Sequence, residues 1–188
     1  AQGVPFAREY GGLLANRSSR TRDGLGSAVA LKASLGAGLV RLFAPEHGWS
    51  GLEPEGAPDS VEPETGLPVH SLYGPRRAPD AAALADLDLV LVDLQDVGVR
   101  CYTYAATAAL LLAAFAKHPR RAAIVLDRAN PLGTGSAGPR LDPGLRSFIG
   151  YFDVPFQHGR TLGGLLRDWA ESAAPDLDLA AIPAPAPL

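Results

Sequence analysis

Reactive side chains follow four apolar runs in this chain, each placed directly after its run ends. These residues are Asn16; Glu46 and His47; Asp93 with Gln95 and Asp96; and Asp127 with Arg128. Carboxyl groups beside amides, a histidine and an arginine suit acid–base chemistry on a polar substrate. The pattern indicates an enzyme-like cleft rather than a purely structural domain.

The elements that must position these side chains are buried parallel strands. Continuous apolar runs of this length, alternating with helical patterns, predict a parallel sheet with helices on both faces. The carboxyl ends of such strands share one edge, where ligands bind. We expect strands near 10–15, 38–44, 88–94, 122–127 and 177–182, and helices near 25–35, 79–85, 103–117 and 161–173, with a long loop over 45–78 and an irregular stretch over 128–160.

Each polar cluster also has a purely structural interpretation. Glu46 can be an ordinary polar strand end, although Pro45 and Gly48 favour precise placement of its carboxyl group. Thr103, rather than Asp96, is placed to cap the next helix, which favours Asp96 for the cleft. Asp127 can pair with Arg128 or with a side chain of another strand, so a simple salt bridge stays open.

Composition excludes several classes of function. The chain has 188 residues, 47% of them hydrophobic and 20% charged, which is typical of one globular α/β domain. A net charge of −3 gives no basic field for nucleic acid, and no apolar run reaches the roughly 20 residues of a membrane span. The lone Cys101 excludes an intrachain disulfide, and the four scattered histidines predict no zinc site and no other metal.

The glycine motif over 133–138 matches GxGxxG literally, but its context is wrong for a dinucleotide. Pro139 follows at once, so the motif opens no helix, and we predict a flexible turn. Gly24-Leu25-Gly26 lacks the third glycine. A nucleotide-binding α/β domain is therefore a disfavoured alternative, and we expect no cofactor.

Several strings of this sequence, in order and with matching spacing, resemble the exo-β-N-acetylmuramidases of the NamZ (YbbC-like) family. They are Ala44–Gly48, Thr65–Val69, Ser71–Gly74, Asp93–Gly98, Tyr102–Tyr104, Leu126–Pro131, Leu141–Phe148 and Pro155–Gly159. The resemblance implies a Rossmann-like α/β domain with an open, mostly parallel sheet. It also implies a bacterial glycosidase that removes N-acetylmuramic acid from the non-reducing end of peptidoglycan fragments.

By this resemblance Glu46 is the strongest catalytic candidate. We hypothesise that Glu46 is the general acid and that Asp96 or Asp127 is the second carboxyl group. The remaining candidates are carried over as substrate-binding residues of the cleft; they are Asn16, His47, Gln95, Arg100, Tyr102, Tyr104, Arg128, Asn130 and His158. Either arginine would suit the lactyl carboxylate of muramic acid.

We expect a catalytic domain over residues 1–183, a linker-like tail over 184–188, and no counterpart of the smaller, C-terminal domain of the family. The absence of an initial methionine suggests processing or a fragment. We expect an extracytoplasmic location, a muro-sugar substrate, and a second copy or partner chain over an exposed cleft wall. The alternative function is a truncated domain that binds muro-sugars without hydrolysing them.

Overall fold

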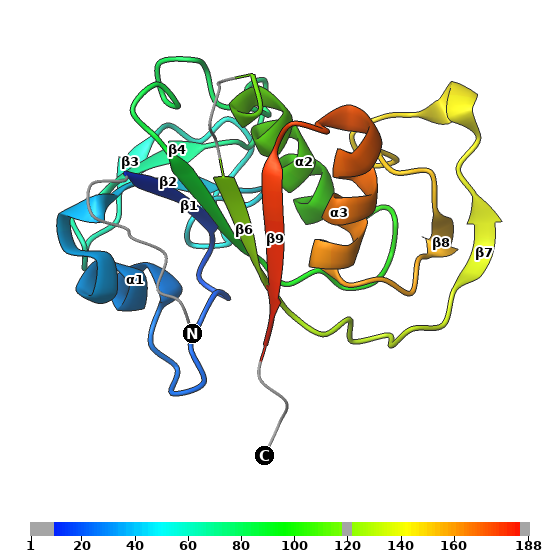
Figure 1. The fold of residues 1–188 in the computed structure, drawn as a ribbon, viewed down its shortest axis with the longest axis horizontal. Coiled ribbons are helices and arrows are strands. Elements are labelled where there is room, and N and C mark those ends of the chain that lie inside the picture. Colours follow the sequence, from blue (N-terminus) through cyan, green and yellow to red (C-terminus); the bar gives the residue numbers. More distant parts are fainter. Residues whose placement is uncertain (1–9, 118–121, 185–188) are drawn as a thin grey trace.

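The computed structural model describes residues 10–117 and 122–184, which form a layered α/β fold (Figure 1). The α-helices are α1 Ser27–Leu35, α2 Tyr104–Phe115 and α3 Leu162–Ala173, with short 3-10 helices η1 Gly36–Gly38 and η2 Pro143–Leu145. The strands are β1 Gly11–Ala15, β2 Leu39–Ala44, β3 Ser60–Val61, β4 Pro68–Ser71, β5 Leu89–Asp93, β6 Ala122–Asp127, β7 Ala137–Arg140, β8 Pro155–Gln157 and β9 Asp178–Pro183.

The main sheet has the strand order β3-β4-β2-β1-β5-β6-β9. All neighbouring pairs are parallel except β3 with β4, so the predicted open, mostly parallel sheet is confirmed. The chain builds outward from β1 through β2 to β4, and then from β5 through β6 to β9. The order therefore reverses between β1 and β5, which is where open α/β sheets bind their ligands.

Helices cover both faces of the sheet, as predicted. Side chains alternate along a strand, so Leu14 and Phe43 pack with α2 and α3, whereas Leu13 and Leu42 lie on the other face with Ala28 of α1. The central strands are buried along their whole length, which explains why they appear in the sequence as continuous apolar runs.

The two helices on the first face are built differently. Most of α2 is buried, which suits its run of alanines and leucines. In contrast, α3 is amphipathic and buries Leu162, Leu165, Leu166 and Trp169 at helical spacing. Thr161 caps α3 by accepting a hydrogen bond from the N–H of Gly164 at 3.1 Å.

Two expectations for the first half of the chain are wrong. The loop predicted over 45–78 contains β3 and β4, and β4 pairs in parallel with β2. A four-residue strand near the sheet edge carries too few apolar residues for a clear pattern. The helix predicted near 79–85 is a series of turns, in which the N–H groups of Leu84 and Leu87 bond three residues back, at Ala81 and Leu84.

The stretch predicted as irregular over 128–160 also contains structure. It leaves the main sheet after β6 and forms a two-stranded antiparallel ribbon, β7 with β8, beyond α3 (Figure 1). The glycine motif over 133–138 opens no helix, and β7 begins at Ala137 within it. Of the tail predicted over 184–188, all but Ala184 lies outside the described residues.

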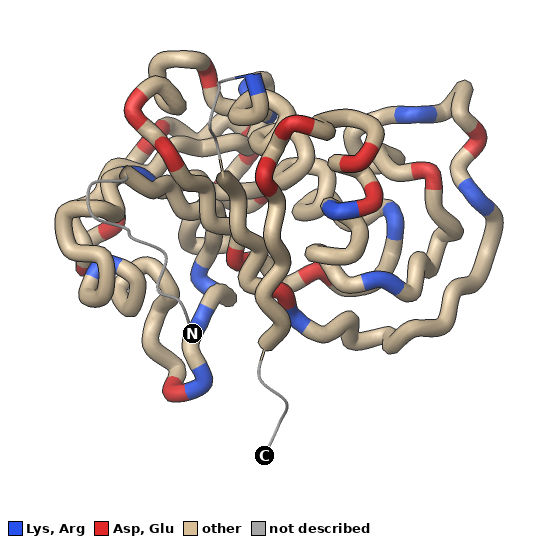
Figure 2. The backbone as a smooth tube through the Cα atoms, in the orientation of Figure 1, with Lys and Arg blue, Asp and Glu red and all other residues tan. Residues whose placement is uncertain are grey.

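Charged residues are distributed along the fold without strong segregation by sign. Lys and Arg positions are interspersed with Asp and Glu positions along the backbone (Figure 2). Within residues 10–117 and 122–184, no helix combines the length and apolar character that crossing a bilayer requires.

Candidate active site

The carboxyl group of Glu46 lies just beyond the end of β2. The hydroxyl of Thr103, at the start of α2, donates a hydrogen bond to Oε2 of Glu46. A tight turn follows, closed by a 2.9 Å bond from the N–H of Gly48 to the carbonyl of Pro45, and His47 adopts a φ of 66° within it. This left-handed conformation is uncommon for a residue with a side chain. The exposed His47 ring stands edge-on to Tyr73, with centroids 5.3 Å apart.

Asn16, after β1, is buried and connects the sheet to the aromatic start of α2. Its Nδ2 donates to the hydroxyl of Tyr104 at 2.8 Å, and its Oδ1 accepts from the hydroxyl of Ser18 at 2.6 Å. The Tyr102 and Tyr104 rings lie 4.6 Å apart. A hollow of about 360 Å³, which we call the tyrosine hollow, is lined by these residues together with Gln95. The structure therefore brings four of the predicted site residues to the switch point of the sheet.

Asp96 and His158 form a buried pair beside this group. Their side chains are 4% and 1% exposed, and Nε2 of His158 lies 3.1 Å from Oδ1 of Asp96. Nδ1 of His158 accepts from the N–H of Arg160 at 3.2 Å, so Nε2 carries the proton of the neutral ring. Gly98 also donates to Oδ1, at 2.7 Å. Oδ2 of Asp96 has no hydrogen-bond partner among the described residues.

The carboxyl groups of Asp96 and Glu46 both affect the pKa of Tyr102. Burial raises the pKa of the Tyr102 hydroxyl strongly, and the neighbouring Tyr104 and the negative charges of Asp96 and Glu46 raise it further. Burial, followed by the charges of Glu46 and Glu55, also raises the pKa of Tyr73. Both phenols therefore stay protonated at neutral pH, and each hydroxyl can donate a hydrogen bond.

A second hollow of about 290 Å³ opens directly on Glu46, and we call it the Glu46 hollow. Its wall includes Glu46, Glu55, Tyr73, Arg77, Ser147 and Phe148. These residues come from the end of β2, the segments around β4, and the turn between η2 and β8. The catalytic candidate is thus accessible from a concave, mixed polar and aromatic surface.

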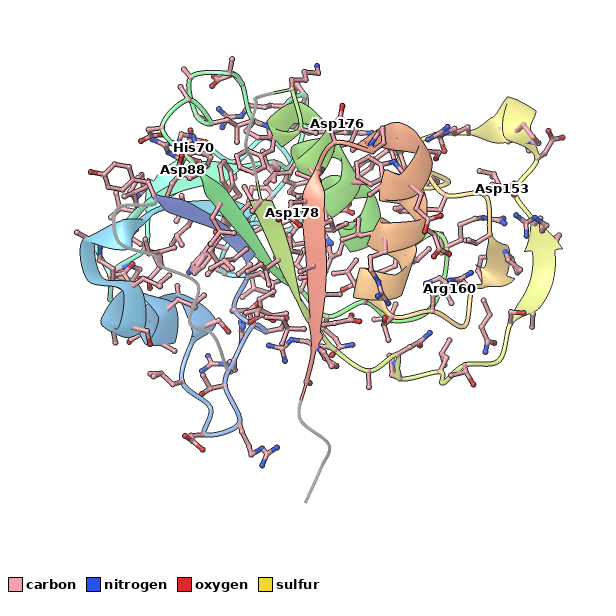
Figure 3. All side chains as sticks on the ribbon, in the orientation of Figure 1. His70, Asp88, Asp153, Arg160, Asp176 and Asp178 are labelled. Atoms are coloured by element: carbon pink, nitrogen blue, oxygen red, sulfur yellow. The ribbon has the colours of Figure 1, made fainter. Side chains whose placement is uncertain are left out.

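A larger hollow of about 750 Å³ lies between α3 and the β7–β8 ribbon. Figure 3 shows two of its lining residues, Asp153 and Arg160, in this part of the molecule. Its ionic groups are largely paired with each other, because Arg140 contacts Asp153 at 3.1 Å and Arg160 contacts Asp168 at 2.5 Å. His158 lines this hollow while its ring bonds Asp96, so the ribbon helps to hold Asp96.

The structure does not bring Asp127 together with Glu46. The Asp127 carboxylate accepts from the hydroxyl of Thr161 at 2.6 Å and from the N–H of Gly163 at 2.8 Å. It therefore stabilises the N-terminus of α3, where the positive end of the helix dipole favours an anion. A Cβ at Gly163 would lie 2.7 Å from the Asp127 carboxyl carbon, so glycine allows this close approach.

Three further candidates also bond mainly to the protein itself. Arg128 holds the buried Asp93 through two bonds of 2.7 and 3.0 Å, and not Asp127, with which a salt bridge had been considered. Arg100 donates to the carbonyls of Pro139 and Val154 and so connects its segment to the β7–β8 ribbon. Asn130 donates to the carbonyl of Arg160 at 2.9 Å.

Sequence reasoning missed part of this arrangement. Thr103 does occupy the N-cap position of α2, but its side chain makes no cap bond and turns to Glu46 instead. Tyr73 and Arg77 both lie in the stretch over 45–78 that was expected to be a long loop, and of the two only Tyr73 falls within a string that resembles the family. No pattern in the sequence placed Phe148 near Glu46. Among the described residues no three His, Cys, Asp or Glu side chains gather as a metal site would require.

Residues 12–185 match the family described as exo-β-N-acetylmuramidase NamZ, N-terminal. The chain belongs to the NamZ family. It is 39% identical over 147 residues to the peptidoglycan β-N-acetylmuramidase NamZ of Bacillus subtilis (strain 168), a match over 77% of this chain and 35% of that protein. The match begins at the second residue of β1 and spans every element that carries a candidate residue.

Two solved structures share the fold of this NamZ family chain. Both are DUF1343 family proteins of Bacteroides fragilis NCTC 9343. The match to one has a TM-score of 0.81 and 32% sequence identity, and it covers 91% of this chain and 44% of the Bacteroides chain. The other has a TM-score of 0.77 and 30% identity, covering 94% and 47%. The chain therefore spans between about a third and a half of the length of these relatives.

Proposed function

We propose that this chain is the catalytic domain of an exo-β-N-acetylmuramidase, which hydrolyses the β-glycosidic bond of N-acetylmuramic acid at the non-reducing end of peptidoglycan fragments. The observation that carries the proposal is Glu46, whose carboxyl group is held by Thr103 and opens on a hollow at the ligand-binding edge of the sheet. The family membership and the printed activity of the Bacillus subtilis relative support the substrate class.

In the proposed reaction Glu46 is the general acid. Thr103 occupies Oε2, so Oε1 is the oxygen that delivers a proton to the leaving glycosidic oxygen. As that bond breaks, positive charge develops on the sugar ring. A second carboxylate then either attacks the anomeric carbon or takes a proton from the water that attacks it from the opposite face of the ring.

We assign the role of second carboxylate to Asp96 rather than Asp127. Oδ2 of Asp96 is buried and makes no bond to the described residues, whereas both oxygens of Asp127 are bonded at the start of α3. The protonated hydroxyl of Tyr102 is influenced by a hydrogen bond with Tyr104 and by the charges of both Asp96 and Glu46, and Tyr102 lines the tyrosine hollow, where it can bond a sugar hydroxyl.

Hydrolysis of a chromogenic β-N-acetylmuramic acid glycoside, compared with the matching glucosaminide, tests this function. The chain should release the chromophore from the muramic substrate alone. Glu46→Gln should reduce turnover by roughly 10²- to 10⁴-fold with an unchanged melting temperature. Glu171→Gln, on the exposed side of α3, is the matched control and should retain activity. An active Glu46→Gln variant would contradict the assignment of the acid.

A domain that binds muro-sugars without turnover is the second candidate. Saturable binding of N-acetylmuramic acid with no release from either glycoside would favour it over hydrolysis. A substrate of peptidoglycan fragments also supports an extracytoplasmic location, which the distribution of the protein between cell fractions would test.

A further inference from the structure

Arg77 is the cationic residue on the wall of the Glu46 hollow. We propose that Arg77 is the specificity-determining residue of this site and binds the carboxylate that distinguishes muramic acid from N-acetylglucosamine. This inference rests on the proposed function. It assigns the choice of sugar to Arg77, whereas the proposed function assigns cleavage of the glycosidic bond to Glu46 and Asp96.

The guanidinium group of Arg77 is free to bind an anion. Among the described residues no carboxylate lies within ion-pair distance of it. The neighbouring Arg76 is already bonded to Asp59, and Arg100 and Arg128 are engaged with carbonyls and with Asp93. Arg77 therefore lines the Glu46 hollow with N–H groups that bond no acceptor within residues 10–117 and 122–184.

Arg77 is also held in place without using those donors. Its guanidinium carbon lies 4.2 Å from the centroid of the Phe148 ring, a stacked arrangement that leaves the N–H edges open. Phe148 sits in a tight turn in which the N–H groups of Ser147 and Gly150 bond each other's carbonyls at 3.1 and 3.2 Å. This preorganisation reduces the entropy lost when a ligand binds.

The backbone leading to Arg77 is constrained as well. Gly74 has a φ of 123°, and a Cβ there would lie 2.9 Å from the backbone nitrogen of Gly56. The N–H of Gly56 donates to the carbonyl of Tyr73 at 3.1 Å, which joins this segment to the Glu55 side of the hollow. The backbone that precedes Arg77 is therefore fixed, and it places Arg77 on the same wall of the Glu46 hollow as Tyr73.

The chemistry of the hollow explains why a cation is needed. N-acetylmuramic acid is N-acetylglucosamine with a lactyl ether on O3, so the two sugars differ by one carboxylate. Glu46 and Glu55 line the same hollow, and their negative charges would repel this carboxylate. An arginine offsets that repulsion and matches a carboxylate with two parallel hydrogen bonds. Without Arg77 the hollow should favour the uncharged sugar.

A carboxylate at this position has two chemical sources. One is the lactyl group itself, which is charged only when no peptide is attached. The other is the peptide stem, whose attachment converts the lactyl carboxylate into an amide but brings carboxylates of its own. We assign the lactyl group, because Arg77 and Glu46 share one hollow of about 290 Å³, near the lower end of ligand-pocket sizes.

Calorimetric titration of the full 188-residue chain tests the assignment with four ligands. They are N-acetylmuramic acid, its lactyl amide, N-acetylmuramic acid bearing an alanyl-glutamate stem, and N-acetylglucosamine. Arg77→Gln is the test variant. Arg146→Gln is the matched control, because Arg146 also stacks on an aromatic ring, 4.9 Å from the centroid of Tyr151, but lines the larger hollow.

The wild-type chain should bind N-acetylmuramic acid roughly tenfold to hundredfold more tightly than the other three ligands. Arg77→Gln should remove that preference, with little change in the affinity for N-acetylglucosamine or in the melting temperature. Arg146→Gln should keep it. Phe148→Leu, which removes the stacking surface, should weaken the preference less than Arg77→Gln does.

Three results would overturn the inference. They are an unchanged preference in Arg77→Gln, equal binding of the acid and its amide by the wild-type chain, and binding of none of the sugars. Tighter binding of the stem-bearing ligand, lost in Arg77→Gln, would reassign Arg77 to the peptide. Turnover is measured separately, so a chain that binds selectively but does not hydrolyse contradicts the proposed function and leaves the role of Arg77 intact.

Discussion

The hydroxyl of Thr103 donates a hydrogen bond to Oε2 of Glu46, which joins the residue before α2 to the second residue after β2. The residue that would normally cap its own helix therefore holds a carboxyl group of a different element. The same helix start supplies Tyr104, which accepts from Asn16 at 2.8 Å. The N-terminal end of α2 thus organises the side chains at the ends of β1 and β2.

Thr103→Val should lower kcat by roughly tenfold to hundredfold, because it keeps the shape of the side chain but removes the hydrogen bond that stabilises the negative charge developing on Glu46 as the proton leaves. The melting temperature should change little, since Thr103 makes no cap bond to α2. Thr103→Ser should restore most of the activity. Steady-state kinetics on the muramic glycoside provides the measurement, and equal kcat values for the valine and serine variants would exclude this role.

Asp127→Ala should destabilise the fold by about 1–2 kcal/mol, because the N-terminus of α3 loses two hydrogen bonds to a carboxylate. The folded fraction should keep its turnover. Asp96→Asn should show the opposite behaviour, with turnover strongly reduced. Urea unfolding and activity, measured on both variants, separate the two carboxyl groups. Loss of turnover in fully folded Asp127→Ala would return Asp127 to the catalytic group.

Arg128→Ala should destabilise the protein by about 3–5 kcal/mol, because it leaves the Asp93 carboxylate buried without its cation. Asp93 is only 3% exposed in the intact pair, so its carboxylate depends on the guanidinium for its counter-charge. Arg140→Ala is the control, since the Arg140–Asp153 pair is more than 60% exposed on both sides and should contribute less than about 1 kcal/mol. Chemical denaturation should resolve the difference, and similar losses in both variants would contradict it.

Asp59 makes the stability depend on pH in the acid range. Burial raises its pKa, but the N–H of Ser71, the Arg76 guanidinium and His70 together bring the pKa below 3.8. A lowered folded-state pKa stabilises the protein above pH 3.8, and this contribution is lost as the pH falls through the folded-state pKa.

The unfolding free energy of Asp59→Asn should therefore lie below that of the wild type at pH 7, and the two should converge as the pH drops below 3.8. Asp59 is 40% exposed, so the difference at pH 7 should stay below about 1 kcal/mol. Urea unfolding curves at several pH values give the comparison. A difference that persists at the lowest pH would mean that packing, not charge, is responsible.

The sequence alone was sufficient for the strands that carry the site. The runs near 10–15, 38–44, 88–94 and 122–127 match β1, β2, β5 and β6 within a residue or so, because strands buried on both faces must be apolar throughout. It failed for β4 and for the β7–β8 ribbon, since strands of three or four residues are too short to show a period, and the ribbon strands are also largely exposed. The long-loop expectation was wrong for the same reason.

The order of residues along the chain also determined which side chains reach the ligand-binding edge, because a parallel sheet places all its strand ends together. Only the tertiary structure decided which of them remain available there. Arg128 is bound to Asp93, and Asp127 is bound at the start of α3, whereas Glu46 opens on a hollow that also contains Arg77. These pairings join segments far apart in the chain, so local spacing contains no signal for them.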